Sequence, residues 1–171
     1  MYIINGSATI VDEHGREEAL HAGDAILVPR GVTYYWKQSK LSMFWVIFDE
    51  GEPEDWADRT AANSYIRFEP HGPEGKLNGE GGTRKHMYYA ARGEKLSAGV
   101  WEADASMSDQ FHEPDYTELM CILQGSVTII DDAGNEELVQ AGDVVLVPKG
   151  MRYQWKQGEY IRKYWVIFDA D

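Results

Sequence analysis

GDVVLVPKGMRYQWKQ (residues 142–157) is nearly a copy of GDAILVPRGVTYYWKQ (residues 23–38). Equivalent residues lie 119 positions apart, and the same spacing relates Gly6 to Gly125. After a one-residue insertion, WVIFD at 45–49 matches WVIFD at 165–169. The chain therefore contains an internal repeat, with residues 1–49 as its first copy and 120–169 as its second.

Hydrophobic residues in each copy recur with a period of two, which is typical of β-strands. Runs such as SVTIIDD and VVLV are short and end at turn signals, for example Ala133-Gly134-Asn135. Short strands with a turn about every 8–12 residues predict an all-β sandwich or barrel. One short helix is expected within 52–65, and the glycine-rich, charged stretch 69–85 is expected to be a mobile loop.

Charge and composition exclude several classes of partner. The chain has 16 basic and 29 acidic residues and a formal net charge of −13, whereas nucleic acids and anionic membranes require a basic face. No apolar run approaches the roughly 20 residues of a membrane span. Cys121 is the only cysteine, so no intramolecular disulfide can form, and its apolar neighbours predict a buried side chain. We predict a cytoplasmic protein that binds neither nucleic acid nor membrane.

At this point the sequence resembles a known family. The residues that carry the resemblance are Gly125, Gly142, Pro148, Gly150 and Tyr153, which are similar to the two motifs of cupins. The stretches 99–125 and 155–168 resemble the ethanolamine-utilisation-type cupins, relatives of the ureidoglycine aminohydrolase cupins, in a double-cupin arrangement. The resemblance implies an all-β, RmlC-like cupin jelly-roll β-barrel: a complete barrel at 86–171, a partial second cupin repeat at 1–49, and a connection at 50–85.

The first copy lacks the strands that should precede its glycine turn, because Met1 lies only five residues before Gly6. Three explanations fit: a misassigned start codon, a natural fragment, or another chain that completes the barrel. A half-barrel leaves strand edges unpaired, and such edges bind available strands. We therefore expect a homodimer with residues 1–49 in or beside the interface.

The resemblance also implies a metal site of three histidines and one glutamate. Glu118 lies seven residues before Gly125, where the motif glutamate belongs, and His112 fits the first histidine. Pro114 and Tyr153 stand where the other two histidines would be. His112 and Glu118 thus remain as candidate ligands of a divalent transition metal, but we expect well under one equivalent and no other cofactor.

Strand alternation predicts a pocket inside the second barrel. On the cupin alignment, Glu118, Tyr153, Trp155 and Gln157 point inward. With the candidate ligand-binding residues Trp101 and Tyr116, these side chains would form an aromatic pocket with a few fixed polar groups, as in small-molecule sites.

Two function classes remain open. In the first, the protein is an enzyme on a small polar metabolite: Glu118 is the general acid or base, Tyr153 a proton donor or anchor, and His112 a second acid–base group at the mouth. In the second, it is a non-catalytic ligand-binding or assembly module that has lost the metal site. A ligand held between Glu118 and Tyr153 would favour the enzyme, and a pocket filled by Trp101 and Trp155 would favour the module.

Overall fold

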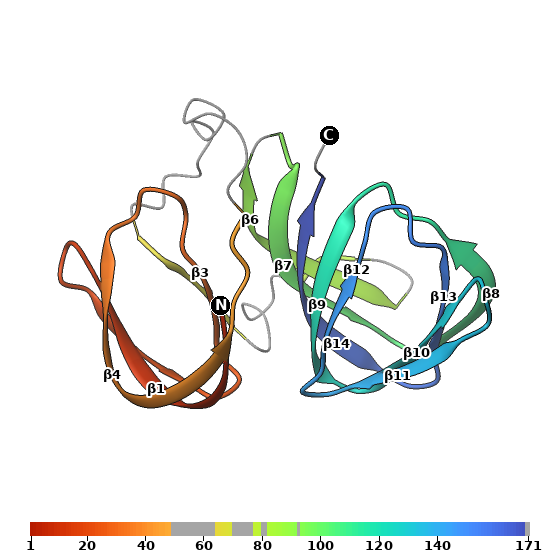
Figure 1. Cartoon of the computed structure of the whole chain (residues 1–171), viewed down its shortest axis with the longest axis horizontal. Coiled ribbons are helices and arrows are strands. Elements are labelled where there is room, and N and C mark those ends of the chain that lie inside the picture. The colour runs from red at the N-terminus through yellow and green to blue at the C-terminus, as the bar shows by residue number, and fades with distance from the viewer. Residues whose placement is uncertain (49–63, 70–76, 80–81, 92, 170–171) are drawn as a thin grey trace. The chain divides into compact units, whose positions relative to one another are not determined.

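The computed structural model describes residues 1–48, 64–69, 77–79, 82–91 and 93–169. Every regular element in these ranges is a β-strand, so the all-β prediction is confirmed. The chain divides into two compact units, unit 1 (Met1–His71) and unit 2 (Gly72–Asp171), which are described separately (Figure 1). The described ranges contain no helix able to cross a membrane. Most of the helix predicted within 52–65 lies outside the described residues.

Unit 1 is one curled antiparallel sheet, drawn from red to yellow in Figure 1. Its strands are β1 (Tyr2–Asp12), β2 (Glu17–His21), β3 (Ala25–Leu27), β4 (Tyr34–Phe44) and β5 (Ile66–Phe68). They follow the order β2-β1-β3-β5, and β4 also pairs with β1. Its core contains Ile3, Ile10, Leu20, Ile26 and Tyr65.

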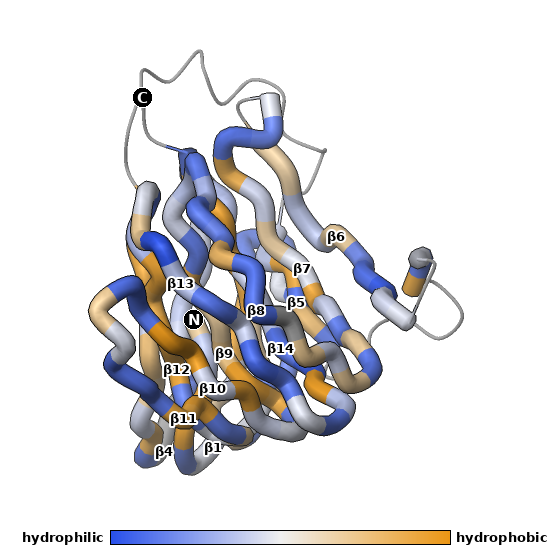
Figure 2. Tube along the Cα trace, turned by 90° about the vertical axis from the view of Figure 1, so that its right-hand side faces the viewer, coloured by the Kyte–Doolittle hydropathy of each residue, from blue (hydrophilic) through white to orange (hydrophobic). Residues whose placement is uncertain are grey.

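Unit 2 consists of two antiparallel sheets that enclose a core. The strands are β6 (Thr83–Ala91), β7 (Leu96–Ala103), β8 (Ser106–His112), β9 (Thr117–Gln124), β10 (Ser126–Asp131), β11 (Glu136–Gln140), β12 (Val144–Val147), β13 (Tyr153–Gln157) and β14 (Ile161–Phe168). The sheet orders are β11-β10-β13-β8 and β12-β9-β14-β7-β6. Hydrophobic and hydrophilic stretches alternate along these strands, as expected where one face is buried (Figure 2).

The two units share strand register over the repeated sequence. Ile10 pairs with Trp36 between β1 and β4, and Ile129 pairs with Trp155 between β10 and β13. The first hairpins also match: the Asp12 carboxylate accepts backbone hydrogen bonds from residues 14 and 16, and that of Asp131 accepts them from residues 133 and 135. The sequence repeat is therefore a repeat of structure within the described strands.

A glycine is required where each copy bends before its hairpin. Gly6 has a φ of +85° and Gly125 a φ of +79°. A Cβ atom would lie 2.2 Å from the Lys40 carbonyl oxygen at Gly6 and 2.1 Å from that of Tyr160 at Gly125. Both the backbone conformation and the close approach of a neighbouring strand exclude a side chain there.

The connection predicted at 50–85 contains strand residues that the sequence interpretation missed. β5 pairs with the edge of β3, where Ile26 lies opposite Arg67, and β6 already begins at Thr83, inside the stretch expected to be a loop. Pairing with existing strand edges gives these short segments a conformation that their glycine-rich and charged surroundings did not indicate.

Candidate functional site

Glu118 lies inside unit 2, on β9 between two strands of its sheet. It is opposite Val147 of β12 and Ile167 of β14, and only 8% of it is exposed. A buried carboxylate is costly unless it is paired. Here the Lys163 ammonium of β14 donates a hydrogen bond of 2.8 Å to Glu118 Oε1.

The ammonium of Lys163 is surrounded by soft, electron-rich groups. It lies 5.0 Å from the centroid of the Trp101 ring and 4.9 Å from that of Trp155, which are cation–π distances. Its Nζ also contacts the sulfur of Met120 at 2.8 Å. Lys163 is as buried as Glu118, at 8% exposed. Together Glu118, Lys163, Trp101 and Trp155 form what we call the ammonium box.

Two tyrosines adjoin the carboxylate of Glu118. Tyr153 begins β13 and is 8% exposed. Burial raises its pKa, and the charge of Glu118 and the neighbouring Tyr116 raise it further. Burial and then Glu118 also raise the pKa of Tyr116. Both phenols are therefore neutral near pH 7 and can donate hydrogen bonds.

His112 ends β8 directly opposite Tyr153, and the two ring centroids are 5.7 Å apart. The imidazole is exposed, unlike the phenol beside it. The structure thus brings the exposed His112 next to the buried Tyr153.

Several polar groups of this cluster have no protein hydrogen-bond partner in the described chain. They are Oε2 of Glu118, the hydroxyls of Tyr116 and Tyr153, and the imidazole of His112. None of these atoms is among the fully buried side-chain atoms that lack a partner in the described residues. They are therefore accessible to water or to a ligand.

Gln157 differs from the other predicted pocket residues. Its side chain is fully buried, and its amide nitrogen donates to the carbonyl oxygens of Ala103, Asp104 and Glu159 at 2.7–3.1 Å. Its amide oxygen accepts a hydrogen bond from Trp155 Nε1. Gln157 therefore joins strand ends and has no donor left for a ligand.

The residues around Glu118 do not fit a transition metal. One oxygen of Glu118 already accepts a hydrogen bond from an ammonium, and His112 is the only imidazole of the predicted set. Tyr153 would have to ionise, against its raised pKa. The described residues contain no cluster of three or more His, Cys, Asp or Glu side chains that could hold a metal ion.

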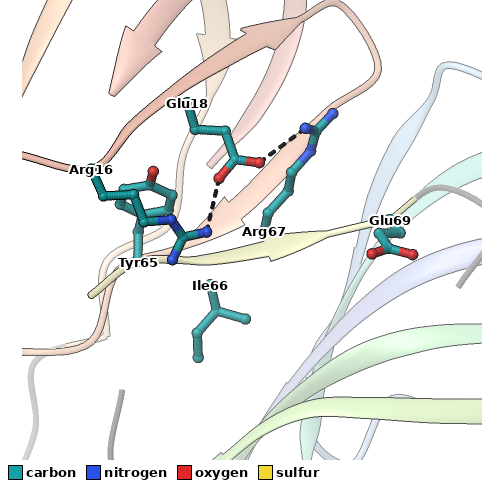
Figure 3. Close-up of a pocket in the computed structure, with 6 residues that line it drawn as sticks. All are labelled: Arg16, Glu18, Tyr65, Ile66, Arg67 and Glu69. Atoms are coloured by element: carbon teal, nitrogen blue, oxygen red, sulfur yellow. Dashed lines mark hydrogen bonds and ion pairs between the residues drawn. The ribbon is translucent and has the colours of Figure 1, made fainter. Parts of the chain in front are cut away.

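An open hollow of about 610 Å³ lies in unit 1 and contains none of the predicted site residues. Figure 3 shows Glu18 between Arg16 and Arg67, with Glu69 standing apart. Arg67 also pairs with Asp24 at 2.9 Å, and Arg16 lies over the Tyr65 ring. Both arginines that line the hollow are thus paired with neighbouring carboxylates.

Lys163 is the functional residue that sequence reasoning missed. In the segment IRKYWVIF, the neighbouring residues Arg162 and Lys163 point to opposite faces of the strand. Alternation alone therefore does not show which of the two cations faces inward. The pairing with neighbouring strands shows which one it is: Arg162 bonds to Glu102, and Lys163 lies opposite Ile122 of the core. An inward carboxylate at Glu118 was the only signal that a buried cation should exist.

Residues 90–165 match the family described as the EutQ-like cupin domain. Over these residues the chain is therefore similar to a EutQ-like cupin domain. The predicted cupin jelly-roll fold is confirmed.

One solved structure has a similar fold over nearly the whole chain, and two others are similar over part of it. A DUF861-family protein of unknown function from Pseudomonas syringae pv. tomato is 16% identical over 97% of this chain and 72% of its own, with a TM-score of 0.73. The EutQ protein of Clostridium difficile is 22% identical over 52% of this chain and 69% of its own, with a TM-score of 0.44. A DUF861-family protein from Thermotoga maritima is 33% identical over 40% of this chain and 76% of its own, with a TM-score of 0.37. No curated protein matches the sequence.

Proposed function

We propose that unit 2 binds a small polar metabolite beside Glu118 and that Glu118 and Tyr153 exchange protons with it. One observation carries the proposal. The buried carboxylate of Glu118 is paired with Lys163 through Oε1, whereas its Oε2 has no partner among the described residues of the protein, and two neutral phenols lie beside it. In this arrangement Glu118 accepts a proton from the ligand, Tyr153 donates one, and the exposed His112 contacts the ligand at the mouth.

The charges of the site favour an uncharged ligand. The Glu118–Lys163 pair is neutral overall, and the raised pKa values keep Tyr116 and Tyr153 uncharged. A charged ligand would enter a partly buried site without a counter-charge, which is costly. A molecule with hydroxyl or amide groups can instead donate to Glu118 Oε2 and accept from the phenols.

A second candidate function is a non-catalytic ligand-binding or assembly module. It is favoured by Trp101 and Trp155, which pack against the hydrophobic core of unit 2 and fill the space around Lys163. The two readings differ in what happens to a bound molecule, because only the enzyme converts it.

A thermal-shift screen tests the binding site. The wild-type chain would be heated with uncharged polyols and amides, with amines, and with carboxylates at millimolar concentration. We expect an uncharged class to raise the unfolding midpoint, since a ligand at a hundred times its Kd stabilises by about 2.7 kcal/mol. The same ligand should not stabilise Glu118→Gln or Tyr153→Phe.

Two controls complete the design. Glu136→Gln changes an exposed glutamate of β11 and should leave the ligand-induced shift intact. Mass spectrometry of the incubated ligand then separates the enzyme from the module. A shift that survives both site substitutions, or a screen in which no polar class binds, would contradict the proposed site.

A further inference from the structure

The side chain of Lys163 reaches the place beside the motif glutamate where a cupin metal ion would be expected. Its Nζ is 2.8 Å from Glu118 Oε1, and the faces of Trp101 and Trp155 flank it at 5.0 and 4.9 Å. All of these groups come from unit 2, on β7, β9, β13 and β14. A cation is thus built into the chain at the centre of the candidate site.

We propose that Lys163 is the resident cation of this barrel: its ammonium replaces the metal ion, and the ammonium box is a binding site for one primary ammonium group. The inference concerns the same site as the proposed function but does not depend on any metabolite being bound. It assigns to Lys163 a positioning role, because the ammonium fixes one oxygen of Glu118 and leaves the other available to a ligand.

The chemistry of the box favours an ammonium over a metal ion. A transition metal needs several nitrogen, oxygen or sulfur ligands. An ammonium needs hydrogen-bond acceptors, and aromatic faces can replace some of them. Here one carboxylate oxygen is the acceptor and two indole rings provide the faces. The thioether of Met120 completes the contacts of Nζ.

Removing the ammonium should leave a vacant site of the same chemistry. In Lys163→Ala the carboxylate of Glu118 would remain buried without its counter-charge, which strongly destabilises a protein. The atoms removed from the side chain correspond to n-propylammonium. This ion should therefore enter the box, pair with Glu118 and restore stability, whereas the neutral molecule of the same shape, 1-propanol, should not.

The experiment measures unfolding midpoints of the full chain. We expect Lys163→Ala to lower the midpoint by more than about 10 °C. Millimolar n-propylammonium should recover at least half of the loss, 1-propanol should recover none, and neither should change the wild type. In Glu118→Gln/Lys163→Ala the ammonium rescue should disappear.

The opposite results would overturn the proposal. If 1-propanol rescues as well as n-propylammonium, Lys163 acts by packing alone. If neither molecule rescues, the box is not an ammonium site. A full equivalent of Mn, Fe, Ni or Zn in the wild type, lost in Glu118→Ala, would mean that the metal has not been replaced.

A second comparison applies if Lys163→Ala does not fold. Lys163→Met keeps most of the stem and removes the charge, and Glu118→Gln/Lys163→Met removes both charges. We expect the double variant to be more stable than Lys163→Met, and the reverse order would overturn the proposal. Failure of the metabolite screen would leave these results unaffected, so the two proposals fail separately.

Discussion

Glu102 shows how a buried acid is held ionised when several donors surround it. It is 4% exposed on β7 and accepts hydrogen bonds from the Tyr160 hydroxyl at 2.6 Å and from Arg84 Nε at 2.5 Å. Arg162 adds a third donor. Burial alone would raise the pKa of Glu102, but these donors outweigh it and lower the pKa to about 2.

This depressed pKa predicts acid sensitivity. Because the folded-state pKa lies below the unfolded value of about 4.5, ionised Glu102 stabilises the fold above that pH, and the contribution disappears as the pH falls toward 2. The contribution is at most about 3 kcal/mol. Urea unfolding at pH 7 and pH 3 should show Glu102→Gln less stable than wild type at pH 7, with the difference in unfolding free energy reduced to less than half at pH 3. Equal destabilisation at both pH values would contradict this role.

The environment of a single residue was predictable from sequence where its chemical type and its position in the strand alternation indicated the same environment. The apolar neighbours of Cys121 predict its burial, and the thiol is buried, with a pKa raised to about 11. Glu118 was placed inside the barrel by alternation and motif spacing together, and it lies there. Lys163 was not found, because alternation alone does not show whether Arg162 or Lys163 faces inward.

At the scale of elements, β7 and β14 pack unusually closely at Gly99. A Cβ atom at Gly99 would lie 2.2 Å from the His86 carbonyl oxygen and 2.7 Å from Cζ2 of Trp165. Trp165 lies directly opposite Gly99 in the sheet and is 6% exposed. The absence of a side chain at Gly99 therefore makes room for a buried tryptophan ring.

Gly99→Ala should accordingly destabilise unit 2. Overpacking of this kind typically costs about 1–3 kcal/mol, which urea unfolding can measure. Gly158→Ala is the matched control, since a Cβ atom there meets nothing within 4 Å, and its effect should stay within about 0.5 kcal/mol. Equal stability of the two variants would mean that β6, β7 and β14 adjust without cost.

The strands that lie within the sequence repeat were predicted correctly from the sequence pattern. The period of two and the turn residues predicted the hairpins of both copies, and these form with matching register. β5 lay outside the repeat, and its three residues carry too little pattern to identify a strand. Such a short segment is specified by the open edge of β3 with which it pairs.

At the scale of the whole molecule, the same tetrapeptide lies in two environments. In unit 2, WVIF (165–168) is paired on both sides, with β7 and with β9. In unit 1, WVIF (45–48) follows β4, whose described pairing is with β1 alone. Trp45 is 59% exposed, Ile47 is 74% exposed, and Trp165 is 6% exposed. Unit 1 thus leaves the apolar segment that follows β4 exposed within the described chain.

An uncovered strand edge with exposed tryptophan and isoleucine side chains favours association. We therefore predict that the 171-residue chain forms a homodimer or a larger assembly through β4 and residues 45–48. Trp45→Lys/Ile47→Lys should shift sedimentation toward the monomer, because lysines on an edge oppose strand addition. Leu138→Lys, at an exposed position of β11, should not. A wild-type chain that sediments as a stable, cooperatively folded monomer at micromolar concentration would contradict the prediction, and it would mean that the exposed side chains of unit 1 are covered within a single molecule.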